Sequence, residues 1–354
     1  MVRNRSELAA SNSDPRTRQS FEGETPSVAG ATEVSPIAAI PEAVSVSAAA
    51  SSGEDRSAQA WSFLTNEELV KRRERLNWSG IQLNHQHYNY LVSGDPDRHF
   101  LSYFINKYIK TPGRVLSLGC GNGHLERVLV GFGLPHTEIV GMDLNPDLMS
   151  YASQEAAKLG YHDLRYEVAD LNRINLPRNS YDLVIFFHSL HHVDNLEGIL
   201  ESVKNTLTDH GLLLVVDFIG PTRWQWTDKQ LSIAQQLLDI LPDDLKIDLH
   251  NQGSNETKSR ITRPLVEDIV RIDPSESIRS GDILALLHSE FKVLEERSMG
   301  GTVLSLLFDG IAGNFDEQNP YVRALIRSLQ KTEELLIANH VLPPDYIFMV
   351  LGRD

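Results

Sequence analysis

The sequence predicts an α/β fold with a doubly wound, mostly parallel sheet that carries helices on both faces. From Gly113 onward, apolar runs of strand length alternate with amphipathic stretches of helix length. One run, residues 181–187 (YDLVIFF), is apolar enough to be buried on both faces, as strands of parallel sheets are. Repeated strand–helix units join parallel neighbours through right-handed crossovers, so this alternation indicates a parallel sheet.

The elements follow one another in order along the chain. The first unit is a strand at 113–119 and a helix at 124–132, which carries Leu125, Val128 and Leu129 on one face. The next helix has Pro146 in its first turn and Gly160 as its stop. The remaining predicted elements are a strand at 137–143, a helix at 145–160, strands at 164–170 and 181–187, a helix at 195–207, and a strand at 212–218 that begins after Gly211.

Length, charge and cysteine content exclude several classes of protein. The chain has 354 residues, which suggests two domains or one domain with a large insertion. Its formal net charge of -15 argues against nucleic acid as a partner, because nucleic-acid binders usually carry a basic surface. The single cysteine, Cys120, excludes a disulfide framework and favours a cytoplasmic protein. No apolar run reaches the length of a membrane span.

The first part of the chain differs from the rest. Residues 1–58 are rich in Ser, Ala, Glu and Pro and contain one aromatic residue, Phe21. Such a segment buries too little apolar surface to offset its ordering entropy, so we expect it to be disordered. Order is predicted to begin near Trp61, with a helix at 64–76 and a second at roughly 97–109.

A glycine-rich loop follows the first strand of the sheet. In VLSLGCGNGHLERVL (115–129), Gly119, Gly121 and Gly123 stand between an apolar run and an amphipathic run. Strand, glycine loop and helix together are typical of a nucleotide or adenosine-like site. The dinucleotide pattern requires glycine where this chain has His124, and no Lys-Ser or Lys-Thr pair of a phosphate-binding loop follows.

This loop resembles the first motif of class I S-adenosylmethionine (SAM)-dependent methyltransferases. The resemblance continues in order through GMDLN, VADLN, YDLVIFFHSLHHV and HGLLLVVDF, over about 105 residues. It implies that Asp143 holds the ribose hydroxyls and that Asp170 and the backbone of Leu171 meet the adenine. A position that is often acidic in this superfamily is Ser117 here. The cofactor-binding residues that the resemblance implies are Gly119, Cys120, Gly121, Gly123, Asp143, Leu144, Asp170, Leu171 and His188.

The resemblance also extends outside the core. Residues 77–104, 219–231, 273–287 and 300–315 resemble segments of a bacterial stand-alone methyltransferase group, so that it covers about 76–352. Members are often associated with glycan or natural-product gene neighbourhoods, and no single substrate is implied.

The family plan implies a Rossmann-like, seven-stranded sheet. After the fifth strand we assign its last helix to 281–291, its sixth strand to 292–298 and its final antiparallel strand to 345–353. Segments inserted at the carboxyl edge of the sheet lie over the ligand, so the additional residues are expected to form a largely helical lid. The predicted parts are a disordered segment (1–58), an N-terminal helical cap (59–110), the SAM-binding core (111–220), a helical lid or substrate insertion (221–279), and a C-terminal completion (280–354) with a second helical insertion (300–343).

Three histidines follow the fourth strand and are the candidate catalytic residues. A hydroxyl acceptor benefits from a base tuned near neutral pH, and His188, which ends the strand, is the first choice. His191 and His192 open the next helix, and a structural role is favoured over a catalytic one for this pair. We expect no metal, because no carboxylate-rich ligand set accompanies the histidines. The candidate substrate residues are Arg223, Trp224 and Trp226, although both tryptophans could serve only to pack the lid.

The sequence thus predicts a SAM-dependent methyltransferase that acts on a small molecule or glycan, at oxygen. Transfer to carbon or nitrogen of a natural product is the alternative within enzymes. A SAM-binding partner protein without catalysis is a second alternative, and a nucleotide-binding oxidoreductase, disfavoured by His124, is a third.

Overall fold

The structure is a computed structural model that describes residues 53–251, 253 and 255–353. All described residues belong to one compact unit. Most of the segment predicted to be disordered therefore lies outside the described residues. Its boundary at residue 58 is wrong, because helix α1 spans Gly53–Ala60 and its residue Ala58 accepts a hydrogen bond from Asn145.

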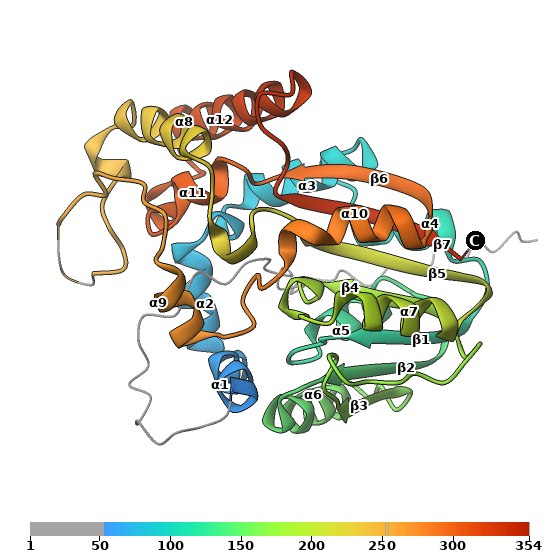
Figure 1. Cartoon of the computed structure of the whole chain (residues 1–354). Coiled ribbons are helices and arrows are strands. Elements are labelled where there is room, and N and C mark those ends of the chain that lie inside the picture. Colours follow the sequence, from blue (N-terminus) through green and yellow to red (C-terminus); the bar gives the residue numbers. More distant parts are fainter. Residues whose placement is uncertain (1–52, 252, 254, 354) are drawn as a thin grey trace, which may run out of the picture. The chain divides into compact units, whose positions relative to one another are not determined.

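A seven-stranded sheet in the order β3-β2-β1-β4-β5-β7-β6 forms the centre of the described chain (Figure 1). All neighbours pair in parallel except β7, which runs antiparallel to both β5 and β6. The predicted fold class is confirmed. The strands are β1 (Gly113–Leu118), β2 (His136–Asp143), β3 (Leu164–Val168), β4 (Tyr181–Phe187), β5 (Leu207–Phe218), β6 (Lys292–Gly300) and β7 (Tyr346–Gly352).

The two faces of the sheet are covered by different helices. Along β4, Leu183 and Ile185 belong to one apolar cluster, whereas Val184 and Phe186 belong to the other. This alternation is the two-residue period of a strand buried on both sides. The first cluster includes side chains of α3 (Gln82–Ser93), α4 (Phe100–Tyr108), α5 (His124–Gly131) and α6 (Pro146–Lys158), and the second those of α7 (Leu196–Thr206) and α10 (Ser280–Glu290).

Strand β5 begins earlier than the sequence predicts. Leu207 already pairs with Tyr181, but the next regular pair is Leu212 with Leu183, so the register shifts between them. A Cβ at Gly211 would lie 2.9 Å from the backbone nitrogen of Thr208. Only glycine fits this close backbone approach. Gly211 therefore lies in an irregular part of β5, whereas the sequence predicted that the strand begins after it.

Two helical insertions interrupt the last third of the fold. Between β5 and α10 lie η4 (Thr222–Trp224), α8 (Asp228–Asp239), η5 (Asp243–Leu245) and α9 (Val266–Ile272), and between β6 and β7 lie α11 (Leu304–Phe308), η6 (Ala312–Asn314) and α12 (Pro320–Ala338). Ala234 of α8 packs with Val303, Leu306 and Leu342 in a separate apolar cluster. Figure 1 shows α8, α11 and α12 gathered together, so the two insertions form one helical layer.

The N-terminal part of the described chain contains two α-helices that the sequence does not predict, α1 and α3. η1 (Ser62–Thr65), α2 (Glu67–Leu76) and η2 (Trp78–Gly80) precede α3, and α4 follows it. The buried face of α3 carries Asn84, His87 and Tyr88 beside Leu83 and Val92. Because polar residues share that face, the apolar periodicity that would have indicated a helix is weak. Among the described residues, no helix is long and apolar enough to cross a membrane.

Candidate functional site

The glycine loop connects β1 to α5 at the carboxyl edge of the sheet. Gly119, Gly121 and Gly123 all have positive φ, at 72°, 54° and 73°. A Cβ at Gly119 would lie 2.4 Å from the Cβ of Ser189, and one at Gly123 would lie 2.6 Å from the Tyr166 hydroxyl. The loop therefore packs closely against Ser189, which follows β4, and Tyr166 of β3. This close packing explains why positions 119 and 123 are glycine.

The backbone N–H groups of the loop are used within the protein. Those of Gly119 and Cys120 donate to the carbonyl of Met142, at 2.7 and 3.0 Å. The N–H of Gly121 donates to Asp143 Oδ2 at 3.0 Å. That of His124, the first residue of α5, donates to Asn122 Oδ1 at 3.2 Å. A pyrophosphate would need such donors, so these four give no support to a dinucleotide site.

A buried acid reinforces this conclusion. Glu126 lies in the first turn of α5 with no exposed surface, and burial raises the pKa of its carboxyl to about 7. Its two oxygens have no hydrogen-bond partner among the described residues. An acidic group in this turn opposes the binding of a phosphate and is compatible with an uncharged nucleoside.

The two aspartates predicted to hold the nucleoside lie at the ends of adjacent strands. Asp143 ends β2, and its carboxylate accepts the N–H groups of Gly121 and Asn145, each at 3.0 Å. Burial raises the pKa of Asp143. Asp170 lies just beyond β3 and accepts the N–H of Asn172 at 2.9 Å. Because each carboxylate oxygen has a second lone pair, both residues retain capacity for ligand hydroxyl or amino groups. Leu144 and Leu171, the residues after them, are half-buried.

A segment far from the core in sequence lies over this edge. Asn122 Nδ2 donates to the carbonyl of Leu64 at 3.0 Å, and Asn145 Nδ2 donates to the carbonyl of Ala58 at 2.7 Å. The side chains of Trp61 and Leu64 pack against Cys120, Leu148 and Met149. We call residues 58–65 the N-terminal strap. Sequence reasoning missed it, although the isolated apolar cluster Trp61–Leu64 at the end of a polar segment was a usable signal.

The three predicted histidines separate into two places. His188 follows β4 with a φ of 52°, an uncommon value for a residue with a side chain. Burial lowers the pKa of its imidazole to about 4, so the ring is uncharged at neutral pH. The ring of His188 makes no hydrogen bond within the described part of the chain. The rings of His191 and His192 instead contact each other, with centroids 4.2 Å apart.

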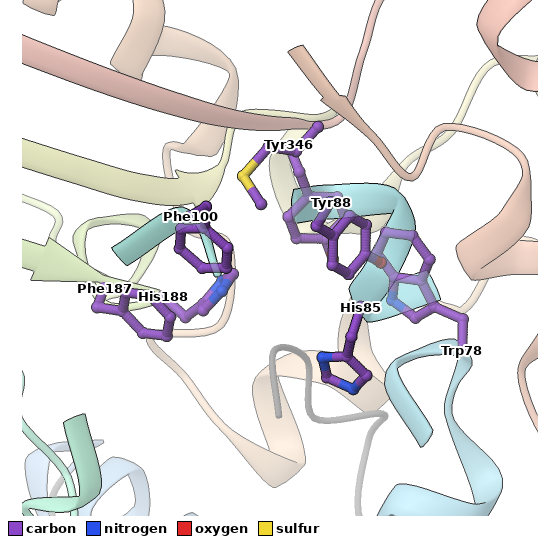
Figure 2. A pocket seen from close by; sticks show the side chains of 8 residues that line it. Trp78, His85, Tyr88, Phe100, Phe187, His188 and Tyr346 are labelled. Atoms are coloured by element: carbon purple, nitrogen blue, oxygen red, sulfur yellow. The ribbon is translucent and has the colours of Figure 1, made fainter. Parts of the chain in front are cut away.

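His188 lines a pocket that is built almost entirely of rings (Figure 2). Figure 2 shows Phe100, Phe187 and His188 on one side and Trp78, His85 and Tyr88 on the other. The lining comes from η2, α3, α4, β4, β6 and β7, and consists of Trp78, His85, Tyr88, Phe100, Phe187, His188, Met299 and Tyr346. Seven of these eight side chains carry a ring, so the pocket suits a flat or apolar ligand.

Two polar atoms of this pocket have no hydrogen-bond partner in the part of the chain that the structure describes. Trp78 and Tyr88 are only 2% and 3% exposed, and neither the indole Nε1 nor the phenol oxygen has a hydrogen-bond partner among the described residues. Burial raises the pKa of Tyr88, which therefore keeps its proton. Leaving buried donors unsatisfied is costly, so each such group needs an explanation. A ligand oxygen would supply one once the side chains around these two atoms move apart, because neither atom is accessible in this structure.

His191 and His192 instead face carboxylates. His191 Nδ1 lies 2.5 Å from Asp217 Oδ1, and the backbone N–H groups of Ser189 and Leu190 donate to Asp217 Oδ2. Burial alone would raise the pKa of Asp217, but His191 and these donors hold it below its usual range. Glu276, from the loop after α9, approaches both rings, and burial raises its pKa to about 7.

The candidate substrate residues after β5 contact other parts of the chain. Arg223 donates to the carbonyls of Glu276 and Pro274, at 2.8 and 2.7 Å. Trp226 Nε1 donates to Asp345 Oδ2 at 3.0 Å, and its ring stacks on Trp224 with centroids 6.0 Å apart. None of the three lines the ring-lined pocket. Their contacts agree with the packing role that the sequence left open.

Comparison with known proteins shows what the core resembles. Residues 109–265 match the family model described as a methyltransferase domain. The chain is 29% identical over 136 residues to the ubiquinone/menaquinone biosynthesis C-methyltransferase UbiE of Pseudomonas savastanoi pv. phaseolicola, which covers 38% of this chain and 53% of that protein. It is 30% identical over 131 residues to the sterol 24-C-methyltransferase ERG6B of Gibberella zeae, which covers 37% of this chain and 32% of that protein. This chain thus spans about half the length of the UbiE relative, and less of the sterol enzyme.

Solved structures give more distant likenesses. A S-adenosylmethionine-dependent methyltransferase from Mesorhizobium loti aligns with 72% of this chain and 95% of its own, with a TM-score of 0.42 and 15% identity. The match at residues 109–265 agrees with the resemblance found in the sequence. This part of the chain is therefore similar to a methyltransferase domain, and S-adenosylmethionine is the methyl donor that such a domain implies.

Proposed function

We propose that this chain transfers a methyl group from S-adenosylmethionine to the oxygen of a small, ring-bearing or apolar acceptor. One observation carries the proposal, namely the wall shared by the glycine loop and the ring-lined pocket. Phe187 and His188 line the pocket, and the next residue, Ser189, is the one that closes on Gly119. An acceptor in the pocket and a cofactor at the loop would therefore lie on either side of the three consecutive residues 187–189.

The residues at the loop fit the cofactor. Asp143 and Asp170 offer carboxylate oxygens with remaining lone pairs at the ends of β2 and β3, as a ribose and an adenine require. The loop donors are turned inward and a buried acid lies in the first turn of α5, which favours a nucleoside without phosphate. S-adenosylmethionine supplies an electrophilic methyl group. The protein's part is to hold the acceptor oxygen in line with that group.

The pocket supports oxygen as the acceptor atom. Trp78 Nε1 and the Tyr88 hydroxyl are buried donors that an acceptor oxygen would satisfy. His188 is uncharged, so one of its ring nitrogens can take the hydroxyl proton as the oxygen–methyl bond forms. The nucleophile loses its proton to His188, and the electron pair of the breaking bond stays on the cofactor's sulfur.

Transfer to carbon is the second candidate. It is favoured by the names of the two curated relatives, both C-methyltransferases, although each match covers less than two fifths of this chain. An apolar pocket of rings suits a carbon nucleophile as well. A glycan acceptor remains a proposal that rests on the resemblance alone.

Binding and product analysis test these proposals. S-adenosylhomocysteine, but not NAD, is expected to bind in calorimetry and to raise the melting temperature. Incubation of the protein with a metabolite extract and methyl-13C-labelled S-adenosylmethionine should then yield an O-methyl signal in 13C NMR. A C-methyl signal would establish the second candidate, and failure to bind S-adenosylhomocysteine would refute both.

Variants of the pocket separate acceptor binding from cofactor binding. Tyr88→Phe removes one donor without changing the ring, and should raise the KM for the acceptor about 2–10-fold while the affinity for S-adenosylhomocysteine stays unchanged. Tyr90→Phe, at an exposed tyrosine of the same helix, is the matched control. Equal KM values for the two variants would remove Tyr88 from the acceptor site.

A further inference from the structure

A compact group of ligating side chains lies outside the ring-lined pocket. His191 and His192 belong to η3, and Glu276 belongs to the loop between α9 and α10. One ligating atom can be chosen from each so that all three lie within 4.8 Å of one another. His191 and Glu276 are buried, and His192 is partly buried. Two elements more than 80 residues apart in the sequence therefore converge on one point.

The hydrogen bonds of the two histidines fix which nitrogen carries the proton. His191 Nδ1 lies 2.5 Å from Asp217 Oδ1, a carboxylate that accepts, so the proton is on Nδ1 and the lone pair on Nε2. The hydroxyl of Ser275 donates to Asp273 Oδ1 at 2.6 Å and therefore accepts from His192 Nδ1 at 3.1 Å. The lone pair of His192 is then also on Nε2.

Both lone pairs face the same carboxylate. His191 Nε2 lies 3.6 Å from Glu276 Oε1, and His192 Nε2 lies 4.0 Å from Glu276 Oε2. These distances are too long for hydrogen bonds. They are close to the spacing of about 3.4 Å between two ligands of one tetrahedral metal ion with bonds near 2.1 Å. The gap between the three groups thus has the size of a bound ion.

Each of the three groups is held by a second partner. Asp217 orients His191, the Asp273–Ser275 pair orients His192, and the Ser277 hydroxyl donates to Glu276 Oε1 at 2.8 Å. Carboxylates and hydroxyls behind the ligands are the usual outer shell of histidine metal sites. Three buried carboxylates, Asp217, Asp273 and Glu276, also gather here, and buried negative charge calls for a cation.

We propose that His191, His192 and Glu276 form a binding site for a divalent transition-metal ion of the zinc type. Two imidazoles and one carboxylate are a donor set that such ions prefer, and three protein ligands leave a fourth position for water or another ligand. The sequence predicted no metal because no carboxylate-rich ligand set accompanies the histidines. The fold brings a carboxylate from position 276.

Cobalt titration tests the site with a readout that is independent of activity. The full chain, stripped with a chelator and dialysed, is titrated with CoCl2 while visible absorption is recorded. We expect saturation at one equivalent, with bands of four- or five-coordinate cobalt that ZnCl2 then abolishes. Absence of a one-equivalent endpoint would overturn the proposal and would mean that protons alone, on imidazolium or carboxyl groups, balance the buried charge.

Matched variants locate the ion. Glu276→Gln and His192→Ala should each weaken binding by at least about tenfold, since even the loss of a residue that only hydrogen-bonds a metal ligand costs about 10–100-fold. His162→Ala, at an exposed histidine before β3, should bind as the wild type does. Circular dichroism and S-adenosylhomocysteine affinity, measured on every variant, separate loss of the metal site from unfolding and from failure of the cofactor site. Equal cobalt binding by all three variants would refute the assignment.

Discussion

Asn122 of the glycine loop donates a hydrogen bond to the carbonyl of Leu64, at 3.0 Å and across 58 residues of sequence. The same side chain accepts the N–H of His124, the first residue of α5, through its oxygen. One residue thus accepts the first N–H of the helix and ties the N-terminal strap to the loop. The strap would have to part from this residue whenever the edge of the sheet opens.

Asn122→Asp separates these two tasks. The substitution keeps the oxygen that accepts the first N–H of α5 and removes the N–H that binds the strap, so the fold should survive. Loss of one such bond is worth about 0.5–1.5 kcal/mol, and we expect bound S-adenosylhomocysteine to dissociate about 2–10-fold faster in stopped-flow measurements. Asn106→Asp, at an exposed residue of α4, is the control. Identical dissociation rates would show that the strap does not retain the cofactor.

Asp143→Ala should weaken S-adenosylmethionine binding by about 1.5–3 kcal/mol, the range for hydrogen bonds to a charged group. The carboxylate also anchors the N–H groups of Gly121 and Asn145, so a small loss of melting temperature is expected as well. Calorimetry on the variant checks the affinity. An unchanged dissociation constant for S-adenosylmethionine would show that Asp143 only stabilises the turn before α6 and does not bind the cofactor.

His188→Ala should lower kcat by about 10²–10⁴-fold if the residue acts as a base. Because burial lowers its pKa to about 4, the basic form is present at all pH values above about 5. The wild-type rate should therefore show no limb from His188 near neutrality and should fall only as pH approaches 4. NMR titration of the imidazole gives the same pKa directly.

The linked effect on stability has a fixed sign. The pKa of His188 is lower in the folded protein than the usual value of 6.5, so protons bind the unfolded chain more readily. The stability difference between the wild type and His188→Ala should therefore shift against the wild type as pH falls from about 6.5 toward 4. A difference that is constant over this range would show that the ring titrates normally.

Gly119→Ala should destabilise the fold by about 1–3 kcal/mol, because the new Cβ would lie 2.4 Å from the Cβ of Ser189. Removing that neighbour in the double variant Gly119→Ala, Ser189→Gly relieves the clash but not the positive φ. We expect part of the loss in urea denaturation to return. If the double variant recovers no stability, the whole loss in Gly119→Ala comes from the positive φ of residue 119 and not from the clash with Ser189.

The core of the fold could be predicted because its signals are local. Strand β4 has the bounds that its apolar run indicates, and the glycine loop, Asp143 and Asp170 lie at one edge because parallel strands end on the same side. The topology of the sheet, once inferred, places these residues without further information.

The acceptor pocket and the cluster at Glu276 could not be predicted in this way. Trp78 and Tyr346 line the same pocket from positions 268 residues apart, and Glu276 reaches His191 through an insertion. Their positions depend on how insertions and the N-terminal helices pack on the sheet. No local periodicity encodes that packing, and the polar face of α3 concealed even the helix that carries Tyr88.

The position of Cys120 has a practical consequence. It is the one cysteine in the sequence, it is 8% exposed, and Trp61 and Leu64 of the strap pack on the cluster to which it belongs. Burial raises the pKa of its thiol, so little of the reactive thiolate forms while the strap is in place. The rate at which an alkylating reagent labels Cys120 therefore measures how often the strap moves away from this edge of the sheet. Saturating S-adenosylhomocysteine should slow that labelling. The native thiol can therefore report strap opening without an engineered probe.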